Sequence, residues 1–215
     1  MSCCSHCESA EEIFGPVAAQ RALKRYRKEG PSQTTKLILR GIRKTEISDA
    51  GLLDIGAGIG VLHHELLGKI VNRVTHVDAS RAFIAIAQDV DEQRGQVESV
   101  KYLHGDAVDV AENLPNAEIV TLDKVICCYP DWENLVRASA NKAEQLYAIS
   151  IPRDRWIVKL VFWFDNLIRR IKGDAFRTFV HPRQQIDTVL KDMGFECSEE
   201  SHTLSWQVAF YSKAS

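Results

Sequence analysis

The feature that most constrains the fold is a glycine-rich run behind a short apolar segment. The segment Leu52–Gly60 reads LLDIGAGIG, so Asp54 closes the apolar part and three glycines follow at alternate positions. A helix-like stretch, Val61–Leu67, comes next. Glycine permits a tight turn and lets the backbone approach a ligand closely. The run therefore predicts a buried strand, a ligand-binding turn and a helix.

The spacing of the glycines separates two classes of nucleotide-binding loop. A dinucleotide-binding loop, G-x-G-x-x-G, needs glycine where Val61 stands, which speaks against a nicotinamide oxidoreductase. The pattern D-x-G-x-G-x-G instead resembles motif I of class I S-adenosylmethionine-dependent methyltransferases, whose loop carries the amino-acid end of the cofactor. The resemblance implies S-adenosylmethionine as cofactor and S-adenosylhomocysteine as product. It also implies these cofactor-binding residues in the loop: Asp54, Gly56, Ala57, Gly58 and Gly60.

Length and charge limit the remaining classes. The 215 residues suffice for one α/β domain, and 27 basic against 29 acidic residues give a net charge of −2. This charge predicts no nucleic-acid partner. No apolar run reaches the roughly 20 residues that cross a bilayer, so we expect a cytoplasmic protein without stable membrane insertion, peripheral contact being left open. The sequence does not indicate an oligomeric state.

Short apolar runs alternate with helical patterns along the middle of the chain, which indicates βαβ units. Strands are predicted at Gly51–Ile55, Arg73–Asp78, Val100–His104, Ile119–Leu122, Gln145–Ile151, Phe195–Glu200 and Leu204–Tyr211. Helices are predicted at Phe14–Lys28, Thr34–Arg43, Gly60–Lys69, Ser80–Arg94, Trp132–Ala140 and Gln184–Met193. The predicted fold is α/β and Rossmann-like, with a seven-stranded, mostly parallel sheet, an antiparallel C-terminal hairpin and helices on both faces.

Two segments stand apart from this alternation. Residues 13–48 are expected to form an N-terminal helical cap on the single domain 13–215, with Tyr26 and neighbouring basic residues near the cofactor's carboxylate. Residues 152–182 form an acceptor-side insertion after the fifth strand. Its apolar stretch Trp156–Ile171 is helical in period with a cationic end. It fits a core helix, the roof of a pocket for an apolar acceptor, or a helix that rests on a membrane surface.

Acidic residues close the second and third strands, where open α/β sheets bind their ligands. The family resemblance implies that Asp78, followed by Ala79, accepts hydrogen bonds from the ribose hydroxyls. It also implies that Asp106 and Ala107 contact the polar edge of the adenine. The alternatives are that Asp78 only caps a helix and that Gly105-Asp106 only forms a turn.

The segment after the fourth strand is expected beside the reacting methyl group. Methyl transfer from a sulfonium is an in-line displacement that needs alignment and exclusion of water. It needs a general base only if the acceptor must lose a proton. The candidates for that role are Asp123, Tyr129 and His181. The alternatives are that Tyr129 only packs in a turn and that His181 is an ordinary loop histidine.

The six cysteines are read as free thiols or ligands rather than as a disulfide framework. Cys127 and Cys128 fit small packing residues or soft ligands near the acceptor. A further group of soft ligands comprises Cys3, Cys4, His6 and Cys7. Adjacent cysteines fit a tetrahedral site poorly, so we expect a flexible tail over residues 1–12 and no metal site.

Two short segments resemble magnesium-protoporphyrin O-methyltransferases more loosely, Cys128–Asp131 and Phe176–His181. The function expected from the sequence is therefore S-adenosylmethionine-dependent methyl transfer to a small, hydrophobic or aromatic molecule, with O-methylation favoured. The alternative is a non-catalytic protein on the same fold that binds S-adenosylmethionine, or a metal(loid) or thiol ligand.

Overall fold

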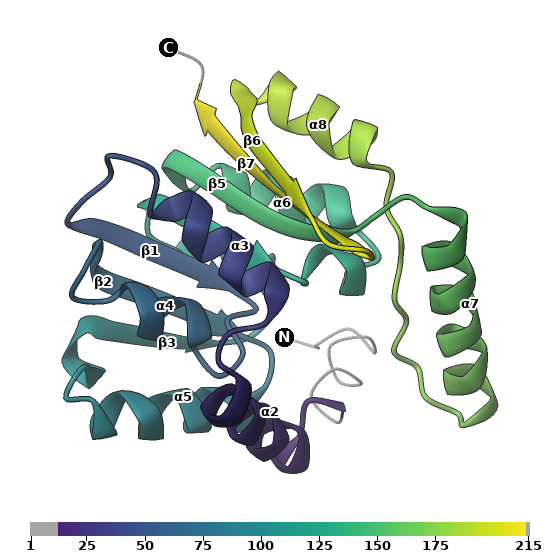
Figure 1. Ribbon diagram of the computed structural model, residues 1–215, viewed down its shortest axis with the longest axis horizontal. Coiled ribbons are helices and arrows are strands. Elements are labelled where there is room, and N and C mark those ends of the chain that lie inside the picture. Colours follow the sequence, from purple (N-terminus) through teal and green to yellow (C-terminus); the bar gives the residue numbers. More distant parts are fainter. Residues whose placement is uncertain (1–12, 214–215) are drawn as a thin grey trace.

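A seven-stranded sheet forms the centre of the computed structural model, which describes residues 13–213 (Figure 1). The strands are β1 (Ala50–Ile55), β2 (Val71–Asp78), β3 (Val100–His104), β4 (Ala117–Asp123), β5 (Ala143–Pro152), β6 (Phe195–His202) and β7 (Trp206–Lys213). Their order is β3-β2-β1-β4-β5-β7-β6. The first five are parallel, while β7 runs antiparallel to both β5 and β6. The predicted fold class is confirmed.

Helices cover both faces of the sheet. They are α2 (Pro16–Glu29), α3 (Gln33–Ile42), α4 (Val61–Leu66), α5 (Arg81–Gln93), α6 (Trp132–Ala140), α7 (Trp156–Ile171) and α8 (Arg183–Asp192). Helices α6 and α8 contribute to one buried cluster and α3 and α4 to another, while α2 and α5 pack together in a third. Leu135 of α6 and Leu190 of α8 pack on one face, while Ile38 of α3 and Leu62 of α4 pack on the other. None of the helices in residues 13–213 is long and apolar enough to cross a membrane.

The structure corrects some predicted boundaries. The helix predicted over Gly60–Lys69 spans only Val61–Leu66, because Leu67 turns extended and Gly68 takes a positive φ of 75°. Leu204 lies in the exposed turn before β7 rather than in the strand. The Cys-rich segment 1–12, with Cys3, Cys4, His6 and Cys7, lies outside the described residues.

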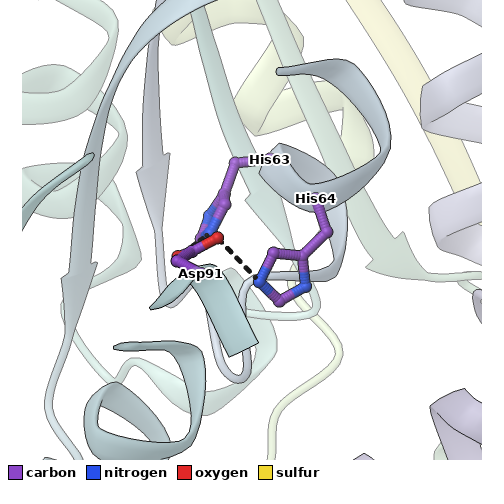
Figure 2. A group of neighbouring side chains, drawn as sticks. All are labelled: His63, His64 and Asp91. Atoms are coloured by element: carbon purple, nitrogen blue, oxygen red, sulfur yellow. Dashed lines mark hydrogen bonds and ion pairs between the residues drawn. The ribbon is translucent and has the colours of Figure 1, made fainter. Parts of the chain in front are cut away.

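A buried polar cluster connects α4 with α5. His63 and His64 of this helix both approach Asp91 of α5 (Figure 2). The Nε2 atom of His63 lies 2.9 Å from Asp91 Oδ2, and Nε2 of His64 lies 3.2 Å from Oδ1. The hydroxyl of Tyr102 on β3 donates a further hydrogen bond of 2.6 Å to Oδ2. All three ligand-type groups, His63, His64 and Asp91, lie within 4.8 Å of one another, a grouping that sequence spacing did not indicate.

Burial and hydrogen bonding together set the protonation states of the side chains in this cluster. Burial lowers the pKa of His76, whose ring lies 5.4 Å from that of His63, to about 3, and neither ring nitrogen of His76 has a partner within the described residues. Burial alone would raise the pKa of Asp91, but the hydrogen bond from His63 and the close approach of His64 hold it well below its usual range. The folded protein therefore keeps His76 neutral beside an ionised Asp91.

The neutral His76 predicts a loss of stability in acid. An unfolded histidine titrates near pH 6.5, so below that pH the unfolded chain takes up a proton that the folded chain, with a pKa of about 3, does not. When the pH falls from 7 to 5, the free energy of unfolding of the wild type should drop by about 2 kcal/mol more than that of His76→Gln.

Urea denaturation at the two pH values measures this difference. The matched control is His202→Gln, since His202 is exposed, and it should keep the pH dependence of the wild type. Equal pH dependence in the wild type and His76→Gln would contradict the prediction.

Candidate functional site

The loop between β1 and α4 has a backbone that only glycine tolerates well. Gly56, Gly58 and Gly60 all take left-handed conformations, with φ of 62°, 58° and 81°. A Cβ atom added to Gly56 would lie 2.4 Å from Val125, and one added to Gly60 would lie 2.3 Å from the ring of His63. The loop is therefore confined between the β4–α6 connection and the histidine cluster.

Asp78, at the end of β2, holds this loop. Its Oδ2 accepts a hydrogen bond of 2.7 Å from the backbone N–H of Gly58, and its Oδ1 accepts one of 2.8 Å from that of Ser80. Burial raises the pKa of Asp78, and the two backbone donors oppose that rise. The carboxylate thus joins the glycine loop to the first turn of α5.

A cavity of about 280 Å³ opens at the carboxyl ends of the parallel strands. Eight of the predicted site residues line it, namely Gly56, Gly58, Asp78, Ala79, Asp106, Ala107, Asp123 and Tyr129. Phe14, Phe83 and Phe176 form much of its apolar wall. The ring of Phe14 meets the other two edge to face, with centroid distances of 5.8 Å and 5.7 Å.

A second hollow of about 260 Å³ also borders the glycine loop and shares Gly56, Gly58 and Asp123 with the first. Its wall includes Asp54, whose side chain is buried. The hydroxyl of Thr121 donates a hydrogen bond of 2.7 Å to Asp54 Oδ1, while Oδ2 has no partner within the described residues. Burial raises the pKa of Asp54 to about 8, so this carboxyl group is mostly protonated at neutral pH.

Asp106 and Tyr129 both line the cavity and form a hydrogen bond with each other. The hydroxyl of Tyr129 donates to the Asp106 carboxylate at 2.8 Å from both oxygens. The backbone N–H of Val108 adds a hydrogen bond of 2.8 Å to Oδ1. These contacts fix the Asp106 carboxylate at the end of β3.

Asp123 ends β4 and connects three parts of the chain. Its Oδ2 accepts a hydrogen bond of 2.6 Å from the hydroxyl of Thr35 on α3. Its Oδ1 accepts one of 2.5 Å from the hydroxyl of Ser150 on β5. Neither partner could be found from the sequence, because Thr35 and Ser150 are 88 and 27 residues away along the chain.

Besides Asp54, which lines the second hollow, three of the predicted site residues do not line the main cavity. His181 is set back from it: its Nε2 lies 3.1 Å from the backbone oxygen of Tyr129, and burial lowers its pKa. Gly60 begins α4 instead, and Ala57 lines the second hollow.

Tyr26, expected beside the cofactor's carboxylate, lines neither hollow. Its hydroxyl donates a hydrogen bond of 2.9 Å to Glu65, and its ring packs beside the cluster that α2 forms with α5 and with Ile59 of the loop.

The two adjacent cysteines differ in their surroundings. Cys127 is buried, whereas Cys128 lines the main cavity. Their sulfur atoms lie 3.6 Å apart as free thiols. The hydrogen bond between them raises the pKa of the Cys127 thiol and lowers that of Cys128.

Comparison with known proteins shows which fold this is. Residues 53–143 match the family model described as a methyltransferase domain. The structure is similar to magnesium protoporphyrin IX methyltransferase from Synechocystis PCC 6803 with bound SAH, at 15% identity and a TM-score of 0.74 over 95% of this chain and 98% of that one. The same protein with bound SAM gives 14% identity and a TM-score of 0.73 over the whole of both chains.

A third similar structure is an O-methyltransferase family protein from Burkholderia thailandensis, at 11% identity and a TM-score of 0.64 over 84% of this chain and 56% of that one. No curated protein matches the chain by sequence. At these identities the likeness establishes the fold, a Rossmann-like methyltransferase fold.

The contact between Gly60 and His63 predicts a specific cost of substitution. Gly60→Ala adds left-handed strain and a clash with the His63 ring, so we expect a loss of about 2–4 kcal/mol in the free energy of unfolding. Gly68→Ala is the matched control, since Gly68 also has a positive φ but nothing lies within 4 Å of its added Cβ. It should lose only about 1 kcal/mol. Chemical denaturation of both variants measures the difference, and equal losses would contradict the steric explanation.

Proposed function

We propose that this protein is an S-adenosylmethionine-dependent methyltransferase that methylates a small, apolar or aromatic acceptor, with oxygen as the favoured acceptor atom; its residues 53–143 match a methyltransferase domain. The observation that carries the proposal is the cavity itself. It joins a glycine loop, strand-end carboxylates and an aromatic wall at the edge where α/β sheets bind ligands.

The predicted cofactor residues fit the chemistry of S-adenosylmethionine. In this proposal Asp78 accepts hydrogen bonds from the ribose hydroxyls, and Asp106 with Ala107 contacts the adenine. The unpartnered Oδ2 of buried Asp54 suits the ammonium group of the methionine end, because a buried carboxylate needs a cation or a donor. Loop residues Gly56, Ala57, Gly58 and Gly60 have little or no side chain, so the ligand can lie close to the backbone of the loop.

The cofactor supplies an electrophilic methyl group on a sulfonium. The protein itself has to align the acceptor and exclude water. In this proposal the rings of Phe14, Phe83 and Phe176 do both. Asp123 is the favoured proton acceptor for a hydroxyl, because its carboxylate borders both hollows.

Tyr129 and His181 take supporting roles in this proposal. The Tyr129 hydroxyl holds the Asp106 carboxylate, and His181 positions Tyr129 through its backbone oxygen.

The acceptor class follows from the composition of the cavity wall. Val125, Leu135 and Cys128 continue the apolar surface of the phenylalanines. The segment 13–48 contributes Phe14 and Thr35, and the segment 152–182 contributes Phe176. We assign these segments as the cap and the acceptor-side insertion. Oxygen as the acceptor atom rests on the likeness to the O-methyltransferase family protein and on the resemblance of Cys128–Asp131 and Phe176–His181 to magnesium-protoporphyrin O-methyltransferases.

Calorimetric titration with S-adenosylhomocysteine tests the cofactor site. We expect micromolar binding, none of NAD or NADP, and at least tenfold weaker binding by Asp78→Ala, which removes charge-assisted hydrogen bonds worth about 1.5–3 kcal/mol. Asp89→Ala, at an exposed position of α5, is the control and should bind like the wild type.

Unchanged affinity in Asp78→Ala would overturn the ribose assignment. Binding without methyl transfer to any porphyrin, quinone or phenol would favour the non-catalytic alternative.

The raised pKa of Asp54 predicts proton release on binding. Its pKa of about 8 means that the free protein holds this proton at pH 7, whereas pairing with an ammonium group requires the carboxylate. Affinity for S-adenosylhomocysteine should therefore rise by nearly tenfold per unit between pH 6 and 7 and level off above about pH 8. Calorimetry in buffers of different ionisation enthalpy should detect close to one proton released by the wild type and none by Asp54→Asn. The same proton release from both proteins would contradict the assignment.

A further inference from the structure

Helix α7 exposes an unusual amount of apolar surface. Eight of the ten large hydrophobic side chains that are exposed among residues 13–213 lie on it: Trp156, Ile157, Leu160, Val161, Trp163, Phe164, Ile168 and Ile171. Trp156 and Trp163 are 74% and 60% exposed, and Val158 is the one buried residue of the helix. Scattered exposed hydrophobic residues are ordinary on protein surfaces, but a continuous set of this size indicates a binding surface.

The exposed side chains form one face. At 100° per residue the eight positions fall within an arc of about 160° centred near Leu160 and Ile171. In Figure 1 the helix stands at the edge of the molecule, away from the sheet. We call this set of eight residues the α7 apolar face.

Contacts on the opposite side fix the orientation of the helix. The ring of Phe162 packs against Trp206 with a centroid distance of 6.4 Å. The side chain of Asn166 donates a hydrogen bond of 2.7 Å to the backbone oxygen of Thr178 and accepts one of 2.9 Å from its N–H. Arg169 pairs with Asp174 at 2.9 Å. Because these bonds are directional, the α7 apolar face is held outward.

Basic residues accompany the apolar face. Residues 153–173 contain six basic and two acidic side chains, although the whole chain carries a net charge of −2. Both acidic side chains already have basic partners, since Asp154 pairs with Lys159 at 2.5 Å and Asp165 with Arg169 at 2.7 Å. The helix therefore combines a large apolar face with an excess of positive charge.

We propose that α7 binds the surface of a bilayer that contains anionic lipids, lying in the plane of the interface. The apolar face enters the acyl boundary, Trp156 and Trp163 lie at headgroup level, and the basic side chains contact lipid phosphates. A helix of 16 residues is about 24 Å long and too short to span the bilayer, so it lies along the interface.

Charge favours lipid over a second copy of this chain. Two copies meeting through this face would bring together two basic segments, which repel each other. An anionic membrane complements both properties of the helix at once.

The position of α7 connects the membrane surface with the cavity. The guanidinium of Arg169 lies 5.3 Å from the ring centre of Phe176, which lines the cavity. Asn166 binds Thr178, two residues further along. If the proposed function holds, an apolar acceptor dissolved in lipid reaches the cavity past this segment. The membrane proposal itself does not depend on methyl transfer.

Vesicle flotation of the purified full chain tests the proposal. Vesicles of phosphatidylcholine with about 30% phosphatidylserine should carry the protein, with a blue shift of its tryptophan fluorescence. The triple variant Ile157→Ser, Val161→Ser, Phe164→Ser should partition at least about tenfold more weakly. The variant Lys159→Glu, Arg170→Glu should lose the preference for anionic over neutral vesicles.

The control removes exposed apolar side chains elsewhere. The variant Val17→Ser, Leu204→Ser changes residues that are 73% and 87% exposed outside α7, and it should bind vesicles like the wild type. Circular dichroism and S-adenosylhomocysteine binding check that each variant is folded. Absence of the wild type from every vesicle, or equal partition of the triple variant, would overturn the proposal. A stable dimer in solution that the triple variant abolishes would also overturn it and assign the face to a second copy.

Discussion

The two hydrogen bonds made by the Asp78 carboxylate are the interaction on which the rest of the site depends. They tie the glycine loop after β1 to the first turn of α5 through the end of β2. Both hollows share this loop as a wall, so its position sets the shape of each. A carboxylate at this strand end thus has a structural role in addition to the role proposed for it with the cofactor.

The loop is also supported from behind. Gly60 leaves room for the ring of His63, and this ring in turn contacts Asp91. The neutral His76 of β2, whose ring lies next to that of His63, completes the histidine cluster. The start of α4 therefore links the glycine loop to the histidine cluster, because Gly60 precedes the helix and His63 lies in its first turn.

Sequence reasoning succeeded where the information is local. The glycine spacing and the acids closing each strand placed Asp78, Asp106 and Asp123 at one edge of the sheet, because parallel strands bring their carboxyl ends together. It missed the aromatic wall, since Phe14 and Phe176 come from segments far apart in the sequence and no local pattern brings them together. It did not anticipate that Tyr26 lines neither hollow and bonds to Glu65, because the packing of α2 on α5 depends on surfaces that no single segment reveals.

The edge-to-face contacts of Phe14 with Phe83 and Phe176 have a consequence for ligand exchange. None of the three rings belongs to the sheet, and each such ring pair contributes about 0.5–1.5 kcal/mol beyond its buried area. Parting them costs far less than the unfolding of an average domain, about 5–15 kcal/mol. Motion of Phe14 and Phe176, which lie outside the helices and strands, away from Phe83 of α5 is therefore enough to admit and release a ligand, while the strand ends proposed to bind it stay in place.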